Sequence, residues 1–333
     1  MSETPVLLIA FRRPYTTQQV IDAIRQVKPK QLFIACDGPR ADKPGEADAC
    51  RETRKVIEEN INWDCEVKKF YSDVNQGCRR GVSNAITWFF EYVEEGIILE
   101  DDCVPHADFF SFCGTLLEHY RHDTRVWCIS GDNFQDGQWR GDGSYYFSRY
   151  PHCWGWATWR RAWQHYDAEL STWSLVKASN LLRSILPDPL EFEAWTYRFN
   201  CLLEKGEPDT WDYIWQYSCW INNALTALPN VNLVQNIGFN SDATHTIQKV
   251  EIVKSIPLNP LRKVQHPSVI IRNEEADAYT FSNHFGGKFM RDAQTSNIFI
   301  GKLRLRLARM KQRTKRLFID PVGLFYSLYH KII

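Results

Sequence analysis

Three consecutive acidic residues, Glu100, Asp101 and Asp102, directly follow a short apolar run at 97–99. Crowded carboxylates repel one another, and a divalent cation would relieve that repulsion. Carboxylate oxygens suit the hard ions Mg²⁺ and Mn²⁺. A cation held there could act as a Lewis acid and neutralise a departing diphosphate. A solvated turn is the competing interpretation, but ligands of open α/β sheets bind at the carboxyl ends of strands, which favours a metal site.

Two earlier apolar runs also end in residues that could bind a nucleotide. Arg12 and Arg13 follow the first run, and Asp37 follows the second. Arginine suits phosphate, while aspartate suits a ribose hydroxyl or a base N–H. Each could equally be a surface charge, but together they fall at one edge of the expected sheet. A P-loop or dinucleotide-binding loop is disfavoured, because neither glycine motif occurs at a strand end.

The elements that must position these residues alternate between apolar runs and amphipathic stretches. Thr16 and Gln19 have capping-box spacing and predict a helix start there. Recurring strands with helices between them predict a parallel α/β sheet. The segment 134–165 is expected to be irregular, and helices are expected over 171–206 and 212–224. The other predicted strands are 6–11, 32–36, 67–71, 96–99 and 126–130, and the other helices lie within 40–62, 82–93 and 108–120.

The composition is that of an ordinary folded chain. Apolar residues make up 44% and charged residues 24% of the 333 residues, which excludes disordered and collagen-like classes. The 40 basic and 40 acidic residues balance, which disfavours a surface devoted to nucleic acid. The sequence shows no signal peptide and no run of 18 apolar residues, so we expect a cytoplasmic protein without a transmembrane helix. Its ten cysteines are scattered, and reduced thiols are expected.

Several segments, in sequence order, resemble the GT-A glycosyltransferases. The main one is GIILEDDCVPHADFFSFCGTLLEHYRHDTRVWCISGDNFQDG, from Gly96 to Gly137. It is most similar to the group formed by N-acetylglucosaminyltransferase I and protein O-mannose N-acetylglucosaminyltransferase. The resemblance covers roughly residues 5–250 and implies a GT-A fold, with a Rossmann-like mixed sheet flanked by helices. The other matching segments are PVLLIAFRRP, YPHCWGWATWRRAW, DTWDYIW and NLVQNIGFNSDATHT.

The resemblance implies inverting transfer of a sugar from a nucleotide diphosphate sugar to a hydroxyl. Asp102 matches the metal-binding aspartate, and Glu100 and Asp101 match acids that contact the ribose or the donor sugar. Arg13 and Asp37 match nucleotide-contacting positions. His245 falls in the loop that closes over the donor. Three roles stay open for this histidine: a metal ligand, a hydrogen-bond donor to phosphate, or a surface residue in contact with solvent alone.

One position departs from the family pattern. Asn84 aligns where the eukaryotic members place a histidine, and asparagine hydrogen-bonds but carries no charge. The diphosphate could instead be held by Arg79 or Arg80. The expected donor is a UDP-sugar, carrying N-acetylglucosamine or another hexose, and the expected acceptor is a glycan, a lipid-linked compound or a small molecule.

Asp212 matches the catalytic base of the family. An inverting displacement needs a carboxylate near the acceptor hydroxyl to take its proton. The neighbours Trp211, Tyr213 and Trp215 would raise the pKa of Asp212 by desolvation. The competing interpretation is an aspartate that caps a helix N-terminus.

Tryptophan is unusually clustered, with nine of the 13 copies in the 67 residues from Trp154 to Trp220. Sugar faces stack on aromatic rings, and the indole N–H can bond a hydroxyl. Most of the nine are expected to build the core. Trp156 and Trp211 are the two predicted to touch the acceptor.

Two other functional classes stay open. A sugar nucleotidyltransferase would share the sheet and the acidic metal site, but it usually has a glycine-rich basic loop after the first strand, which the segment 11–14 lacks. A non-catalytic carbohydrate-binding protein would explain the tryptophans but not Asp212 together with the complete acidic run.

Within the expected fold, we assign 1–135 to nucleotide-sugar binding, 136–255 to acceptor binding and 256–333 to a C-terminal extension.

The end of the chain is strongly basic. Residues 302–316 hold eight lysines and arginines and no acid, and an apolar, aromatic stretch follows. Without these eight, 32 basic residues face 40 acidic ones, so the rest of the chain is acidic. The pattern of 302–333 suits peripheral contact with an anionic membrane. A solvated helix packed on the catalytic domain, or a disordered end, is the competing interpretation.

Overall fold

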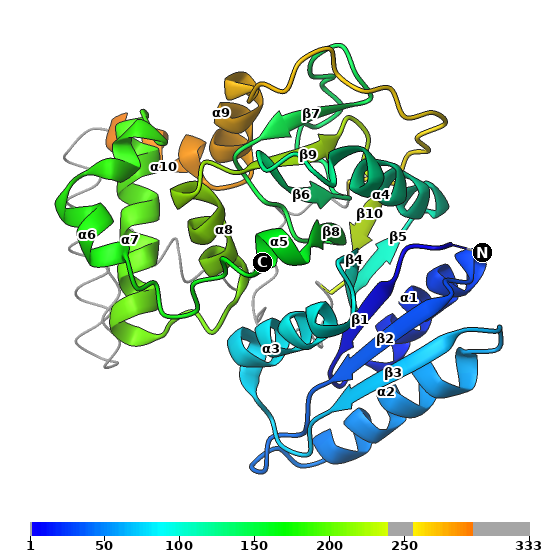
Figure 1. Cartoon of the computed structure of the whole chain (residues 1–333). Helices are drawn as coiled ribbons and strands as arrows, with labels where there is room; N and C mark the ends of the chain where they lie inside the picture. The colour runs from blue at the N-terminus through cyan, green and yellow to red at the C-terminus, as the bar shows by residue number, and fades with distance from the viewer. Residues whose placement is uncertain (1, 239–255, 296–333) are drawn as a thin grey trace.

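An eight-stranded mixed β-sheet forms the centre of the computed structural model, which describes residues 2–238 and 256–295 (Figure 1). The strand order is β3-β2-β1-β4-β8-β6-β9-β7, and a separate two-stranded sheet pairs β10 with β5. The strands are β1 (Val6–Ala10), β2 (Gln31–Cys36), β3 (Glu66–Tyr71), β4 (Glu95–Glu100), β5 (Cys103–Pro105), β6 (Val126–Ser130), β7 (Tyr145–Ser148), β8 (Trp156–Trp159), β9 (Leu225–Pro229) and β10 (Val234–Asn236).

The sheet is parallel in its first half and mixed in its second. Strands β3, β2, β1 and β4 pair in parallel, whereas β8 is antiparallel to both β4 and β6. The prediction of an irregular segment over 134–165 is confirmed for 134–144 and 149–155, but it is wrong for β7, β8 and the short helix α5 (Arg160–Trp163). All four residues of β8 are buried between two neighbouring strands, so tertiary pairing determines this element.

Helices flank the sheet and confirm the predicted fold class, a mixed α/β sheet between helices. The helices predicted over 171–206 and 212–224 are confirmed by α6 (Trp173–Ala178), α7 (Pro189–Lys205) and α8 (Asp212–Ile221). The group α6–α8 lies at the opposite end of the molecule from β3 and α2 (Figure 1). The remaining bounds are α1 (Pro14–Val27), α2 (Glu46–Asn60), α3 (Gly77–Tyr92), α4 (Ala107–Tyr120), η1 (Leu181–Ser184), α9 (Glu274–Asn283) and α10 (Gly287–Thr295).

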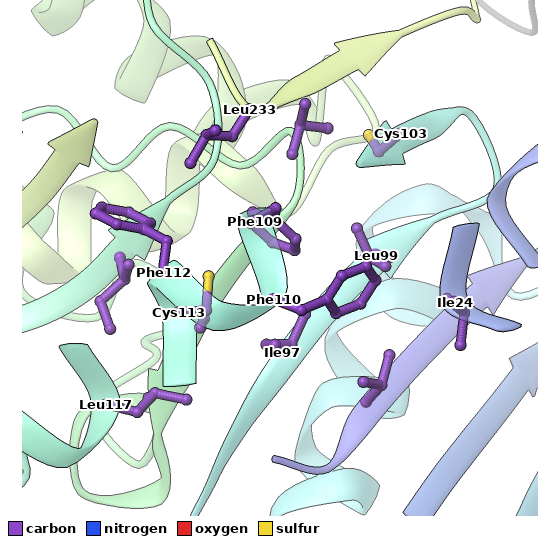
Figure 2. Packing of buried hydrophobic residues seen from close by; sticks show 14 of the residues in the cluster. Ile24, Ile97, Leu99, Cys103, Phe109, Phe110, Phe112, Cys113, Leu117 and Leu233 are labelled. Carbon is purple, nitrogen blue, oxygen red and sulfur yellow. The ribbon is translucent and has the colours of Figure 1, made fainter. Parts of the chain in front are cut away.

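The alternating side chains of the parallel strands form a separate core on each face of the sheet. Val6 and Leu8 of β1 pack with α1, α2 and α4, whereas Leu7 and Ile9 pack with α3, α5 and α8. Figure 2 shows part of the first core, where aromatic residues of α4 lie against β4. Since both faces are covered, these strands are continuous apolar runs, which is why the sequence predicts them.

Helix α1 begins two residues before the predicted capping box. Pro14 is its first residue, and Arg13 occupies the N-cap position without a side-chain cap. Proline is favoured there because its ring fixes φ and the first N–H of a helix has no intrahelical partner. The Thr17 hydroxyl donates instead to the Arg13 carbonyl at 2.7 Å, so the capping-box prediction is wrong.

The clustered tryptophans mainly build the interior. Eight of the nine between Trp154 and Trp220 are at most 4% exposed, and Trp154 is half-buried. Trp195 and Trp220 belong to a third core among α6, α7, α8 and α9. This confirms that most of the cluster is core.

A partly buried contact of the exposed His266 ties the segment before α9 to β7 and α4. The Tyr145 hydroxyl lies 2.8 Å from His266 Nδ1, and the His266 ring stacks on His119 at 3.7 Å between centroids. Desolvation, with a smaller effect of His119, lowers the pKa of His266.

This contact predicts a pH-dependent stability. A histidine whose pKa is lowered by folding adds its full contribution to the free energy of unfolding when the pH is above its unfolded pKa of about 6.5. This contribution is lost as the pH falls through the lower pKa of the folded state. Melting temperatures measured from pH 7.5 to pH 5 should therefore fall more for the wild type than for His266→Gln. A constant difference between the two proteins across this range would contradict the prediction.

Two further expectations concern the cysteines and membrane helices. All ten cysteine thiols are free. No helix in residues 2–238 and 256–295 is long and apolar enough to cross a membrane. The predicted loop with His245 and the basic tail at 302–333 lie outside the described residues.

Candidate functional site

Two adjoining cavities open at the carboxyl end of the parallel strands. The larger, of about 690 Å³, is lined by the ends of β1, β2, β3 and β4 and by the start of α3. The smaller, of about 120 Å³, is lined by the start of α8 and by segments that follow β6 and precede β8. Four residues line both cavities: Cys78, Glu100, Asp102 and Asn236. The predicted acidic run therefore lies where the two cavities meet.

Arg13 holds two of the three acids. Asp101 is 2% exposed, and its carboxylate accepts hydrogen bonds from Arg13 and, at 3.1 Å, from the Phe11 amide. Arg13 Nη1 also lies 2.8 Å from Asp102 Oδ2. Thus Arg13, predicted to contact the nucleotide, lines the larger cavity while it neutralises part of the acidic run.

Glu100 lies where the two cavities meet, beside Asp101 and Asp102. Desolvation, with repulsion from Asp102 and Asp101, raises the pKa of Glu100 to about 8. A divalent cation between Glu100 and Asp102 would relieve this repulsion.

The donor set of the acidic run fits a metal that substrate phosphates help to bind. Within the described residues, no group of three or more His, Cys, Asp or Glu side chains is arranged to hold a metal ion. Mg²⁺ is commonly bound by one or two carboxylates together with substrate phosphates, so two carboxylates are sufficient.

Asp37 lines the larger cavity and organises its rim. Its carboxylate accepts from the Gly38 amide at 2.8 Å, from the Gln76 amide at 2.9 Å and from the Asn75 side chain at 2.9 Å. Desolvation raises its pKa although these hydrogen bonds oppose the rise. Much of its accepting capacity is therefore used on the β3–α3 connection.

Asp209 joins the α8 side of the site to helix α3. Its carboxylate accepts from the Cys78 amide at 2.8 Å and from the Arg79 amide at 3.1 Å, at the first turn of α3. An acid there is favourable because the N-terminus of a helix carries partial positive charge. Gly77, with φ of +79°, allows this contact, since a Cβ atom would lie 2.6 Å from Asp209 Oδ2.

Gly77→Ala is expected to destabilise the protein through this contact. A positive φ costs an L-residue about 1–2 kcal/mol, and the added methyl would also displace Asp209. Gly45→Ala is the matched control, because Gly45 has φ of +78° but no atom within 4 Å of its Cβ position. In urea unfolding, Gly77→Ala should lose more free energy of unfolding than Gly45→Ala. Equal losses in the two variants would show that the contact with Asp209 does not contribute to stability.

Asp212 is the first residue of α8 and lines the smaller cavity. Its Oδ1 accepts from the Thr210 hydroxyl and, at 2.9 Å, from the Tyr213 amide. Desolvation raises the pKa of Asp212, which these hydrogen bonds partly offset. A carboxylate with a raised pKa is a better proton acceptor, as general-base catalysis requires.

The two tryptophans predicted to touch the acceptor lie in different places. Trp211 is 2% exposed and lines the smaller cavity. Trp156 is 1% exposed, lines neither cavity and stacks on Trp211 with 5.5 Å between ring centroids. A direct acceptor contact by Trp156 would need its buried indole to become exposed.

The remaining predicted residues divide into those on the larger cavity and those away from it. Asn84 lines it. Arg12 lines neither cavity, and its guanidinium lies 3.2 Å from Glu46. Arg80 is exposed and also lines neither cavity.

Sequence reasoning missed Arg40, Asn75 and Asp209, which all line the larger cavity. Arg40 follows the Asp37-Gly38-Pro39 turn, so its position after the second strand was an available signal. For Asn75 and Asp209 the sequence carried no comparable signal, because each depends on a contact between distant segments.

Comparison with known proteins gives structural likenesses only. No protein-family model and no curated protein matches the sequence. A mannosyltransferase from Pyrobaculum calidifontis, in complex with GDP-Man and Mn²⁺, matches at 13% identity and a TM-score of 0.31, over 48% of this chain and 45% of that one.

Two other solved structures show similar likeness. A mannose-1-phosphate geranyltransferase from Thermus thermophilus matches at 12% identity and a TM-score of 0.32, over 68% of this chain and 73% of that one. A UDP-glucose pyrophosphorylase complexed with UDP-glucose matches at 8% identity and a TM-score of 0.27, over 48% of this chain and 78% of that one.

Proposed function

We propose that this protein is a metal-dependent glycosyltransferase that moves a sugar from a nucleotide diphosphate sugar to a hydroxyl, with inversion at the anomeric carbon. The observation that carries the proposal is the meeting of two cavities at Glu100 and Asp102, with Asp212 on the smaller one. Such an arrangement suits two substrates that react where the cavities join.

The larger cavity is the proposed donor site. Its volume of about 690 Å³ lies within the range of about 300–1,000 Å³ that small-molecule sites occupy. Asp37 and Asn75 line it and are the proposed contacts to the nucleoside. Arg13 and Arg40 also line it and are the proposed contacts to phosphate, although Arg13 is paired with Asp101 and Asp102, and Arg40 with Glu46. We propose a UDP-sugar as the donor.

Glu100 and Asp102 would hold the divalent cation, Mn²⁺ or Mg²⁺, with the donor's phosphates. When bound, the ion supplies Lewis-acid stabilisation of the departing diphosphate. Arg13 keeps Asp101 and Asp102 in place for this role.

Asp212 is the proposed base. Attack by the acceptor oxygen on the anomeric carbon breaks the bond from that carbon to the diphosphate oxygen, and the hydroxyl proton passes to Asp212. Asp212 lines the smaller cavity and not the larger one, so in the proposed arrangement the acceptor hydroxyl and its base lie in the smaller cavity and the departing diphosphate lies in the larger one. This geometry supports inversion.

The experiment is a thermal-shift screen of nucleotide diphosphate sugars with and without Mn²⁺, followed by product analysis. A bound donor stabilises by mass action, so the correct donor should raise the melting temperature, and more so with Mn²⁺. Release of nucleoside diphosphate under Mn²⁺ would support the proposal. Formation of pyrophosphate from a nucleoside triphosphate and a sugar 1-phosphate would instead identify a nucleotidyltransferase.

A further inference from the structure

A buried histidine–aspartate pair lies on the smaller cavity. His152 Nδ1 is 2.7 Å from Asp132 Oδ1, and both side chains are 2% exposed. Asp132 is itself fixed, since it accepts from the Ser130 hydroxyl at 3.2 Å and from the Trp154 amide at 3.4 Å. Both residues line the cavity on which Asp212 lies.

The second ring nitrogen of His152 is unused. Nε2 is buried and has no hydrogen-bond partner in the part of the chain that the structure describes. When the ring is neutral, the carboxylate of Asp132 holds the proton on Nδ1, which leaves a lone pair on Nε2. A buried polar atom without a partner is costly, so its retention on a cavity wall points to a ligand.

The cavity favours an uncharged partner for this nitrogen. Its walls include the aromatic rings of Phe134, Trp211 and Phe285, which suit the apolar face of a sugar. Among the described residues that line it, four are carboxylic acids and none is lysine or arginine: Glu100, Asp102, Asp132 and Asp212. A phosphate or carboxylate group on the acceptor would meet the carboxylates of Asp132 and Asp212, and no lysine or arginine among the described lining residues offsets them.

We propose that His152 Nε2, oriented by Asp132, accepts a hydrogen bond from a neutral acceptor, a sugar or other polyol, and positions it for attack. This rests on the proposed function and extends it by naming the acceptor class and the residues that hold it. With a polyol, a hydroxyl next to the reacting one donates to Nε2. With water, the second proton of the attacking molecule does so.

The test measures turnover of the donor by His152→Phe, His152→Gln and Asp132→Asn, with water as the acceptor. His152→Phe should lower kcat for Mn²⁺-dependent donor hydrolysis by about 10- to 100-fold, as expected for loss of one buried hydrogen bond. The donor KM should change less than about two-fold, because His152 does not line the donor cavity. Glutamine can accept through its side-chain oxygen, so His152→Gln should recover most of the rate.

The matched control is His165→Phe, which replaces an exposed histidine that stacks on Trp127. It should hydrolyse the donor like the wild type. An unchanged kcat in His152→Phe would overturn the proposal, as would equal losses in the phenylalanine and glutamine variants. Asp132→Asn gives a second test if the phenylalanine variant does not fold, and an unchanged kcat there would overturn the orienting role.

The acceptor class is tested by adding glycerol or glycerol 3-phosphate to the wild-type reaction. Glycerol should be glycosylated in preference to its phosphate. Equal or greater glycosylation of the phosphate, or no glycosylated glycerol, would overturn the neutral class. If the wild type neither binds nor turns over any nucleotide diphosphate sugar, the proposed function fails first, which is distinct from failure of the His152 assignment.

Discussion

Asp212→Asn is expected to lower sugar transfer by about 10²- to 10⁴-fold, the range that a general base contributes. Asparagine keeps the shape of the side chain and can still accept from the Thr210 hydroxyl and the Tyr213 amide, but it cannot take a proton. Donor binding should be retained, because Asp212 lines the smaller cavity only. The measurements are single-turnover transfer and the thermal shift caused by the donor with Mn²⁺.

Asp209→Asn is the control for this prediction. Asp209 lies three residues before Asp212, in the connection that leads into α8, but it lines the larger cavity and caps α3. Its substitution should alter stability and donor binding more than the rate of the transfer step. Full turnover by Asp212→Asn would contradict the assignment of Asp212 as the base, whereas loss of its donor-induced shift would indicate a role in donor binding.

The parts of the fold that the sequence predicts are those whose signal is local. Strands β1, β2, β4 and β6 are buried on both faces, so each is a short continuous apolar run. Strand β8, Trp-Ala-Thr-Trp, is only four residues long and follows a glycine-rich aromatic segment. Its place between β4 and β6 depends on pairing with distant strands, which no local pattern encodes.

The candidate site divides in the same way. The acidic run and Arg13 were predictable because parallel strands place their carboxyl ends at one edge of the sheet. Arg12 follows the same strand, yet it points to Glu46 of α2 and not into a cavity, and the sequence cannot distinguish two adjacent arginines. The pair of His152 and Asp132 joins residues 20 positions apart in the segments on either side of β7, and it becomes visible only once the chain is folded.

Asp102→Asn and Asp101→Asn should impair different properties, although the two residues are neighbours: Asp102→Asn should impair turnover and Asp101→Asn should impair stability. Asp102 lines both cavities and is 14% exposed at its side chain, so it can reach a metal bound between them. Its replacement should lower Mn²⁺-dependent donor turnover by about 100-fold or more, since a Lewis-acid metal contributes several kcal/mol to transition-state stabilisation. Stability should change little, because Arg13 keeps its partner Asp101.

Asp101→Asn should instead act mainly on stability. Asp101 is the more buried of the two partners of Arg13 and also accepts from the Phe11 amide, so its replacement weakens charge-assisted hydrogen bonds that contribute about 1.5–3 kcal/mol, although Arg13 keeps Asp102. The pair of variants is compared by urea unfolding and by the Mn²⁺ dependence of the donor-induced thermal shift. If Asp102→Asn kept its full Mn²⁺ response while Asp101→Asn lost it, the metal ligand would be Asp101. Arg13 would then have to release a carboxylate on metal binding, so the ion pair that stabilises the empty site would compete with the metal for it.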